Sequence, residues 1–206
     1  MTRSAAWYSL IALILFGAAA LAAESARKQW TFNDAAVDTL PAGFRAEVGS
    51  WAVAFDGNEK VLSQTARSPD EVFNVILATD TRAADVDLTV KLKAIAGKDD
   101  QGGGLVWRAR DKDNYYVARY NPLEDNFRLY KVEKGKRTMF KNADIKATPG
   151  WHTLRVTMQG KHMVCYYDGA KQLEADDDTF TEAGMVGLWS KADAQSYFDD
   201  LTLISP

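Results

Sequence analysis

Cysteine and histidine are nearly absent from this chain of 206 residues. The sequence has one cysteine, Cys165, so no disulfide can form within the chain. His152 and His162 are the only histidines, and no group of Cys and His residues has the spacing of a zinc site. Cys165 lies in the apolar run at residues 163–167, which predicts a buried, unreactive thiol. Stability must therefore come from the packing of a hydrophobic core.

The sequence also lacks an excess of basic residues. Its 25 Lys and Arg residues are balanced by 28 Asp and Glu residues, so the formal net charge is −3 at pH 7. General nucleic-acid binding needs a clustered basic surface, and this balance disfavours it. After the N-terminal segment we expect no membrane span.

The N-terminus has the pattern of a secretory signal peptide. Arg3 supplies a short positive region, residues 10–22 are apolar, and Ala20-Leu21-Ala22 offers an A-x-A cleavage site. The apolar run is shorter than the ~20 residues of a transmembrane helix, and an uncleaved anchor is the alternative. Removal of residues 1–23 from 206 leaves one domain of 183 residues, 24–206, with a formal charge of −4 because Arg3 is lost. We expect a periplasmic or secreted protein.

Helical periodicity is scarce in residues 24–206. Short segments alternate apolar and polar side chains instead, which is typical of half-buried strands. The segments are 87–93, 104–109, 115–121, 127–133, 153–158, 162–167, 185–190 and 196–204. Turn signals such as Lys134-Gly135 and Asp168-Gly169 separate them. The one helical candidate is a single turn at residues 68–74, capped by Ser68. The pattern predicts an all-β sandwich or barrel.

Three stretches carry a resemblance to a known superfamily. They are QGGGLVWRARD (101–111) with NYYVARYNP (114–122), GWHTLRV (150–156) with YYDG (166–169), and GMVGLW (184–189) with YFDDLTL (197–203). In this order they resemble the concanavalin A-like lectin/glucanase superfamily, and within it the exported bacterial family named for 3-keto-disaccharide hydrolases. The resemblance implies a jelly roll of two antiparallel sheets, one of them concave. It does not decide the function, because the superfamily contains lectins, hydrolases and adhesion modules.

Strand alternation places one set of side chains opposite the apolar positions. The set is Arg108, Arg119, Asn121, Arg128, Tyr130 and Trp189. If these residues share the concave face, planar donors beside aromatic rings suit a saccharide ligand. In the alternative, the arginines are exposed strand residues and Trp189 fills the sandwich. A one-residue slip in register would invert each assignment.

Catalytic carboxylates are not evident. The E-x-D-x-x-E pattern of the glucanases is absent, which disfavours the usual two-carboxylate hydrolysis. The resemblance leaves open a hydrolase or lyase that acts on 3-keto-disaccharides, since the carbonyl acidifies the neighbouring C–H group. Such chemistry needs a base and a donor for the enolate. Glu124 is the candidate base, with Arg108 and Arg119 as stabilising donors, although its place in the connection at residues 122–126 favours a solvated turn residue.

A structural calcium ion is a further expectation from the resemblance, because jelly-roll relatives hold one between an N-terminal acidic segment and a C-terminal strand. The matching ligands would be Asn33 or Asp34 with Asp199 or Asp200. In the alternative, Asp199 and Asp200 only fix the last strand through hydrogen bonds.

Three functions stay open at this point. The first is a non-catalytic glycan-binding module outside the cytosol, and the second is the hydrolase or lyase. The third is a structural or adhesion domain with a protein partner, which would expose an apolar patch. The missing carboxylate pattern favours the glycan-binding module.

Overall fold

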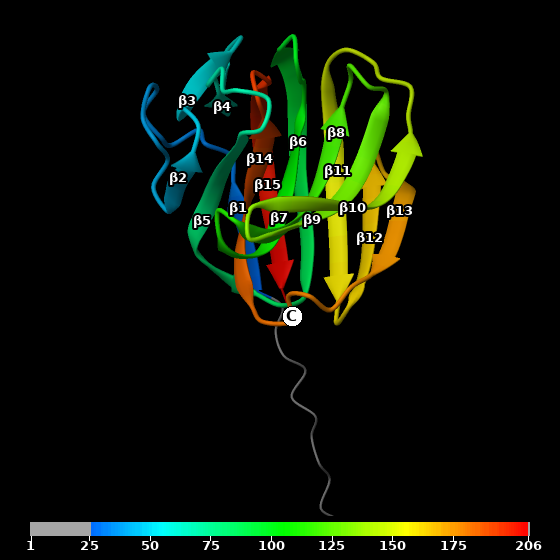
Figure 1. The fold of residues 1–206 in the computed structure, drawn as a ribbon. Coiled ribbons are helices and arrows are strands. Elements are labelled where there is room, and N and C mark those ends of the chain that lie inside the picture. Colours follow the sequence, from blue (N-terminus) through cyan, green and yellow to red (C-terminus); the bar gives the residue numbers. More distant parts are fainter. Residues whose placement is uncertain (1–25, 206) are drawn as a thin grey trace, which may run out of the picture.

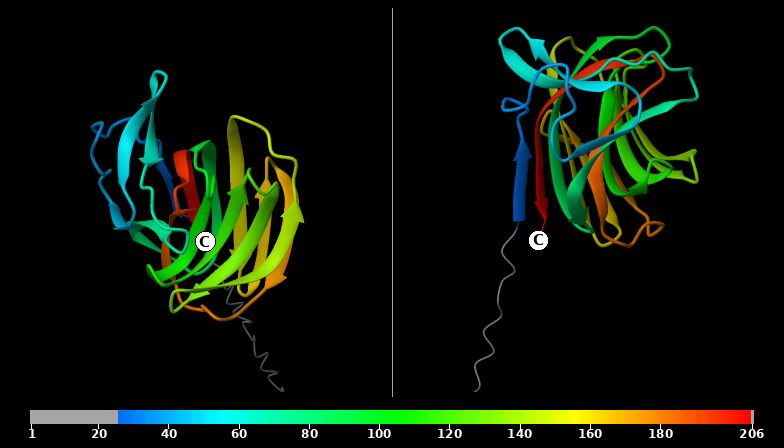
Figure 2. Two further views of the ribbon diagram at one scale, coloured as in Figure 1. Left: turned by 45° about the horizontal axis from the view of Figure 1, so that its top comes forward. Right: turned by 90° about the vertical axis from the view of Figure 1, so that its left-hand side faces the viewer.

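The computed structural model describes residues 26–205, and the predicted signal peptide at residues 1–23 lies outside them. The described residues form two antiparallel sheets packed face to face and contain no helix (Figures 1 and 2). The prediction of an all-β jelly-roll sandwich is therefore confirmed. Between residues 26 and 205, no helix is long and apolar enough to cross a membrane.

The first sheet has eight strands. From edge to edge its order is β13 (Ala170–Asp176), β12 (His162–Tyr167), β11 (Trp151–Gln159), β6 (Val86–Ala96), β15 (Gln195–Ser205), β4 (Glu59–Gln64) and β3 (Trp51–Asp56). The eighth strand, β1 (Ala26–Trp30), pairs with the C-terminal half of β15, whereas β4 pairs with its N-terminal half.

The second sheet has seven strands. Its order is β10 (Lys136–Asp144), β9 (Asn126–Glu133), β8 (Asn114–Asn121), β7 (Gly103–Asp111), β14 (Gly184–Lys191), β5 (Phe73–Ala83) and β2 (Phe44–Val48). The face of each sheet that turns toward the other sheet is called its inner face, and the opposite one its outer face.

The core lies between the two inner faces. Strand β6 shows how the sequence builds it, since Leu88, Val90 and Leu92 are fully buried while the residues between them are not. They belong to the same core cluster as Trp107 of β7 and Tyr116 of β8. Full burial of one such side chain is worth about 1.5–3 kcal/mol. The period-two pattern is therefore the main source of stability in this fold.

Two predicted turns are two-residue hairpin turns. Lys134 and Gly135 have φ values of 53° and 76°, and Asp168 and Gly169 have φ values of 47° and 80°. Positive φ at both central residues is the geometry that matches the twist of paired strands, and Gly adopts it without steric cost. The first turn joins β9 to β10 and the second joins β12 to β13.

The single turn predicted at residues 68–74 is present at residues 69–72, but it is not helical and Ser68 does not cap it. This segment makes one turn, in which the N–H of Val72 donates to the carbonyl of Pro69 (3.0 Å), and Phe73 then begins β5. The Ser68 hydroxyl bonds the side chain of Asn74 at 3.1 Å instead of capping a helix. The β-branched and apolar residues from Phe73 onward favour a strand, which ends the turn at once.

The seven-stranded sheet is strongly curved. In a flat sheet β9 and β14, with β8 and β7 between them, would lie roughly 14 Å apart. A single side chain nevertheless reaches rings on both strands. The guanidinium carbon of Arg137, which lies on β10, is 4.5 Å from the ring centre of Tyr130 on β9 and 5.8 Å from the ring centre of Trp189 on β14. The β9–β10 hairpin bends across the sheet (Figure 1), so the outer face is concave.

Candidate functional site

One row of residues crosses the concave outer face of the seven-stranded sheet. Strand register places Asn142 beside Arg128, Arg128 beside Arg119, Arg119 beside Gly104, and Gly104 beside Trp189. Tyr130 lies in the next row. The structure therefore brings together Arg119, Arg128, Tyr130 and Trp189.

Arg119 and Asp100 form a buried ion pair in this row. The Arg119 Nη2 donates to the Asp100 Oδ1 at 2.7 Å, and the side chains are only 2% and 3% exposed. Burial raises the pKa of Asp100, although the positive charges of Arg119 and Lys191 act to lower it. Burial also opposes the charge of Arg119, but Asp100 outweighs it and the pKa of Arg119 lies above its usual value. The pair is therefore a fixed part of the face.

A second carboxylate, that of Asp193, holds the loop of Asp100 in place. Asp193, between β14 and β15, accepts hydrogen bonds from the backbone N–H groups of Lys98, Asp99 and Asp100 at 2.7, 3.1 and 3.0 Å. Burial opposes its ionisation, but these three N–H groups outweigh burial and lower the pKa of Asp193. An ionised Asp193 thus fixes the loop that carries Asp100.

Asn121 links Asp100 to the β8–β9 turn through hydrogen bonds. Its amide nitrogen donates to the Asp100 carboxylate at 3.1 Å. Its oxygen accepts the N–H groups of Leu123 (2.8 Å) and Glu124 (3.3 Å), which shapes the β8–β9 turn. Both ends of this fully buried side chain have partners, so Asn121 positions its neighbours.

Glu124 lies at the rim of the concave face. Its Oε2 accepts hydrogen bonds from Arg128 Nη1 (2.6 Å) and Asn126 Nδ2 (2.9 Å), with Arg119 Nη1 at 3.5 Å. Burial opposes ionisation, but Asn126 and Arg119 outweigh it, so the pKa of Glu124 lies below its usual value. A carboxylate held in this way is a weak general base.

The aromatic rings of the face are covered. Trp189 is 0% exposed and Tyr130 is 4% exposed. Trp189 packs against Phe73 (5.4 Å between ring centres) and donates its indole N–H to Tyr115 at 3.1 Å. The Arg137 guanidinium lies over Tyr130, Phe73 and Trp189 at 4.5, 5.2 and 5.8 Å from the ring centres. A sugar cannot stack on Trp189 in this structure, because the indole ring has no exposed surface.

Arg108 does not reach the concave face, and the prediction that it converges with Arg119 is wrong. The register of β7 shifts after Trp107, and Arg108 has a φ of 48°. Its guanidinium donates to the backbone carbonyls of Ala84, Phe180 and Gly160, each at 2.6 Å. A β-bulge thus turns Arg108 toward one end of the sandwich, where it joins three segments of chain.

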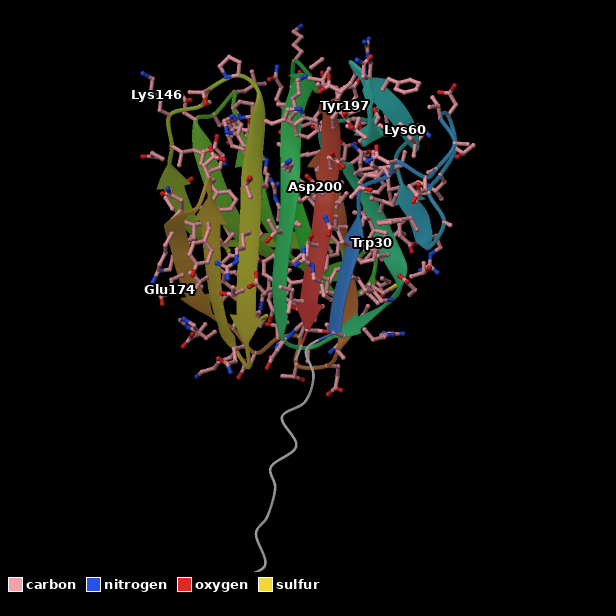
Figure 3. The ribbon with its side chains drawn as sticks, turned by 180° about the vertical axis from the view of Figure 1, so that it is seen from behind. Trp30, Lys60, Lys146, Glu174, Tyr197 and Asp200 are labelled. Atoms are coloured by element: carbon pink, nitrogen blue, oxygen red, sulfur yellow. The ribbon has the colours of Figure 1, made fainter. Side chains whose placement is uncertain are left out.

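The residues predicted to bind calcium do not fit that role. Lys60 donates its ammonium group to the backbone carbonyls of Asn33 (3.0 Å) and Ala35 (2.8 Å), and so supplies a positive charge in the loop that also holds Asp34. Lys60 lies on β4, the strand next to β15, which carries Asp200 (Figure 3), so its positive charge stands beside the proposed site.

Asp199 and Asp200 have protein partners instead. The Asp199 carboxylate accepts the N–H of Asp200 at 2.7 Å, and Asp200 pairs with Lys91 at 2.7 Å. No group of three or more His, Cys, Asp or Glu residues suited to a metal occurs among residues 26–205. These contacts match the alternative in which the two aspartates fix the last strand.

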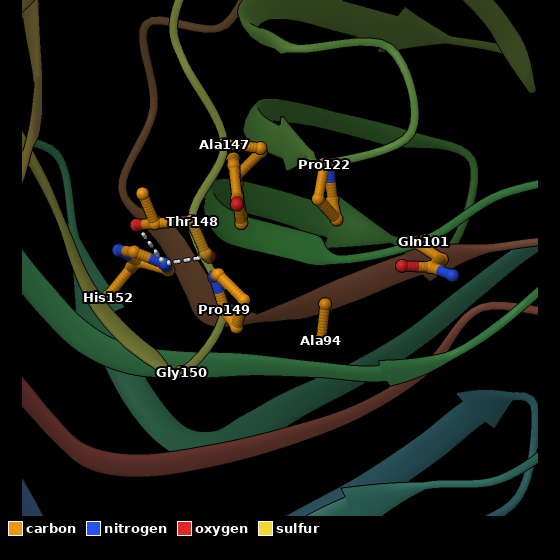
Figure 4. Close-up of a pocket in the computed structure, with 9 residues that line it drawn as sticks. Ala94, Gln101, Pro122, Ala147, Thr148, Pro149, Gly150 and His152 are labelled. Atoms are coloured by element: carbon orange, nitrogen blue, oxygen red, sulfur yellow. Dashed lines mark hydrogen bonds between the residues drawn. The ribbon is translucent and has the colours of Figure 1, made fainter.

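A separate pocket of about 280 Å³ opens at one end of the sandwich, between the β10–β11 connection and β8 (Figure 4). His152 lies in its wall, and both ring nitrogens have acceptors, the Asp168 carboxylate at 2.8 Å and the Thr148 carbonyl at 2.7 Å. The hydroxyl of Tyr120 is buried and has no hydrogen-bond partner. The described lining of the pocket contains no Arg, Lys, Asp or Glu side chain, in contrast to the concave face.

Three residues of the concave face were missed by the sequence analysis. Arg137 pairs with Val132 across the Lys134-Gly135 turn, so extending the hairpin through that turn would have placed it beside Tyr130. Asp100 lies in a loop, and Lys191 lies at the end of β14 at 3.6 Å from Asp100. No local pattern marks these two, since their neighbours come from distant parts of the sequence.

The sequence matches no protein-family model and no curated protein. The fold is similar to that of several solved structures. A carbohydrate-binding module, CBM66 from Bacillus subtilis, has a TM-score of 0.68 at 20% identity, over 77% of this chain and 93% of that one. A Bacillus subtilis protein of unknown function with a galectin-like fold has a TM-score of 0.60 at 16% identity, over 78% and 88% of the two chains.

A third similar structure is domain 4 of AbnA, an extracellular GH43 arabinanase from Geobacillus stearothermophilus, in complex with arabinotriose. Its TM-score is 0.61 at 13% identity, over 88% of this chain and 93% of that one. At such low identity these likenesses establish the fold alone, which is a jelly-roll sandwich of two antiparallel sheets.

Proposed function

We propose that this protein binds a saccharide on the concave outer face of the seven-stranded sheet. The observation that carries the proposal is the cluster of polar groups around Arg119. Arg119 and Arg128 both donate hydrogen bonds to the Glu124 carboxylate, and Arg128 and Glu124 remain 29% and 43% exposed. Fixed guanidinium and carboxylate groups can donate to and accept from sugar hydroxyls. The similar structures named for carbohydrate binding support the same assignment.

The recognition rests on hydrogen bonds more than on stacking. Trp189 and Tyr130 lie beneath Arg137 and present almost no free surface, so a sugar would meet charged groups first. Met139, which is 53% exposed and pairs with Tyr130, supplies apolar surface at the β10 edge. A curved face with such groups suits a short oligosaccharide.

Glycoside cleavage is the second candidate, and one observation favours it. Asp100 and Glu124 both bond Arg119, and their pKa values are shifted in opposite directions, upward for Asp100 by burial and downward for Glu124. Such a divergence is typical of acid and base pairs. Asp100 is only 3% exposed, however, and a buried acid lacks access to a scissile bond. Binding without cleavage is therefore the better-supported function.

The test is calorimetric titration of the purified protein with a panel of oligosaccharides. Arg128→Ala should weaken binding by about tenfold or more, because it removes a charged donor worth about 1.4 kcal/mol or more. Arg155→Ala is the matched control, since Arg155 also pairs with a carboxylate, Asp87, but lies on the other sheet. Gln101→Ala probes the pocket at the end of the sandwich.

Three results would count against the proposal. These are no saccharide binding by the wild type, equal binding by Arg128→Ala, or loss of binding in Gln101→Ala alone. Turnover of a 3-keto-disaccharide would instead support the hydrolase. We also propose that the protein is exported, on the basis of its N-terminal sequence, and N-terminal sequencing of protein from the culture medium or periplasm that starts at Met1 would contradict cleavage of residues 1–23.

A further inference from the structure

Arg137 is a cationic side chain without an acidic partner. Its guanidinium lies over the rings of Tyr130, Phe73 and Trp189. Its Nη1 is buried and has no hydrogen-bond partner, and no carboxylate of residues 26–205 lies within ion-pair distance of it. Burial and the nearby Arg119 charge lower its pKa. A buried donor without a partner is unfavourable in a folded protein.

Two carboxylates, Asp100 and Glu124, lie close enough to Arg137 to influence its pKa, and both already pair with other cations. Asp100 pairs with Arg119 at 2.7 Å and lies 3.6 Å from Lys191, and Glu124 pairs with Arg128 at 2.6 Å. Arg137 is therefore a cation on this face without a carboxylate of its own.

Arg119 has a second donor without a partner. Its Nε is buried and has no acceptor among the described residues, although Nη1 and Nη2 are both used. Arg119 is only 2% exposed, whereas Arg137 is half-buried, so Arg137 is the arginine that a ligand could approach. A planar carboxylate matches the fork of a guanidinium, and such a pair is stronger in a partly desolvated site than in water.

We propose that the concave face binds a carboxylated saccharide, such as an oligosaccharide of uronic acids, with the ligand carboxylate paired to Arg137. This inference rests on the proposed saccharide-binding function and adds the chemical class of the ligand. The aromatic rings below Arg137 hold its guanidinium in place, because a cation over a ring face is attracted to it. The excess positive charge favours an acidic ligand over a neutral one of the same shape.

The experiment compares oligosaccharides of galacturonate, mannuronate and glucuronate with their methyl esters, which have the same rings and no charge. Calorimetric titration should give at least about tenfold tighter binding for one acid than for its ester, as expected for a charge-assisted pair. Added salt should reduce the difference. Arg137→Gln should abolish the preference for the acid.

Arg155→Gln is the matched control, because Arg155 also lies over a ring, Tyr166 at 4.9 Å, but has its own carboxylate in Asp87. It should keep the preference. If Arg137→Gln does not fold, Arg137→Lys retains the charge but loses the fork, and it should reduce the preference.

The outcomes separate the two proposals. A wild-type protein that binds neutral oligosaccharides, loses them in Arg128→Ala and shows no preference for any acid would overturn this inference alone. A persistent preference in Arg137→Gln would overturn it as well. A wild-type protein that binds neither acids, esters nor neutral oligosaccharides would overturn the proposed function with it.

Discussion

The guanidinium carbon of Arg137 on β10 lies 4.5 Å from the ring centre of Tyr130 on the neighbouring strand β9. The same guanidinium covers Trp189, which is fully buried. Arg137 thus covers an aromatic cluster, and among residues 26–205 it is the one cation over the rings of Phe73 and Trp189.

Arg137→Ala should expose Trp189 and lower the free energy of unfolding by about 1–2 kcal/mol, the range of a partly desolvated cation–π contact. Urea denaturation measures the stability. Tryptophan emission should shift to the red, and the shift should disappear when Trp189→Phe is added to Arg137→Ala. An unchanged emission spectrum would show that Arg137 does not cover Trp189 in solution.

Arg108→Ala should be among the most destabilising changes in this chain. It removes donors from three backbone carbonyls, those of Ala84, Phe180 and Gly160. The expected loss is about 2–4 kcal/mol, because an unsatisfied buried acceptor such as the Phe180 carbonyl costs about 1–3 kcal/mol, whereas the partly buried carbonyls of Ala84 and Gly160 can bond water. Chemical denaturation measures it, and a loss below that of Arg155→Ala would contradict this role.

Arg119→Met should leave the Asp100 carboxylate buried without its main cation. Breaking such a pair costs about 3–5 kcal/mol. The double variant Arg119→Met, Asp100→Leu should recover much of the loss, since it removes the stranded charge. A double-mutant cycle by denaturation tests this, and additive effects of the two changes would contradict a coupled pair.

The pH dependence of stability should differ between the wild type and Glu124→Gln. The pKa of Glu124 is lowered in the folded protein, so its contribution is fully present above the ordinary value of 4.5 and is lost as the pH falls through the lowered pKa. The wild type should be more stable by less than ~1 kcal/mol near neutral pH, because the side chain is 43% exposed. Equal or growing differences in acid would contradict this assignment.

Cys165 should react with thiol reagents only after unfolding. Its side chain is fully buried, and burial raises the pKa of the thiol. The thiolate is the reactive form, so both effects slow modification. Labelling by a disulfide reagent in native buffer, at a rate similar to that in denaturant, would be the opposite result.

The inner and outer faces of β8, β9 and β14 could be predicted from the sequence because alternation is local. Tyr116 and Ala118 face the core, whereas Tyr115 and Val117 belong to the outer cluster. Strand β10 could not be predicted in this way, because apolar and polar residues do not alternate along it and none of its residues is fully buried. It is placed by the hairpin turn and by pairing with β9.

The errors at the site have physical causes. Arg108 was misplaced because a bulge after Trp107 shifts the register of β7, and a bulge leaves no signature in the apolar pattern. Asp100 was missed because Asp193, far away in sequence, fixes its loop. Such contacts depend on the closed sandwich and not on local sequence.

The most direct test of the account is to map backbone amide shifts by NMR while the protein is titrated with an oligosaccharide that binds. The account predicts that the largest shifts occur in β8, β9 and β10 around Arg119, Arg128 and Arg137. Shifts confined to the pocket at residues 147–152, or to the eight-stranded sheet, would contradict a saccharide-binding site on the concave face.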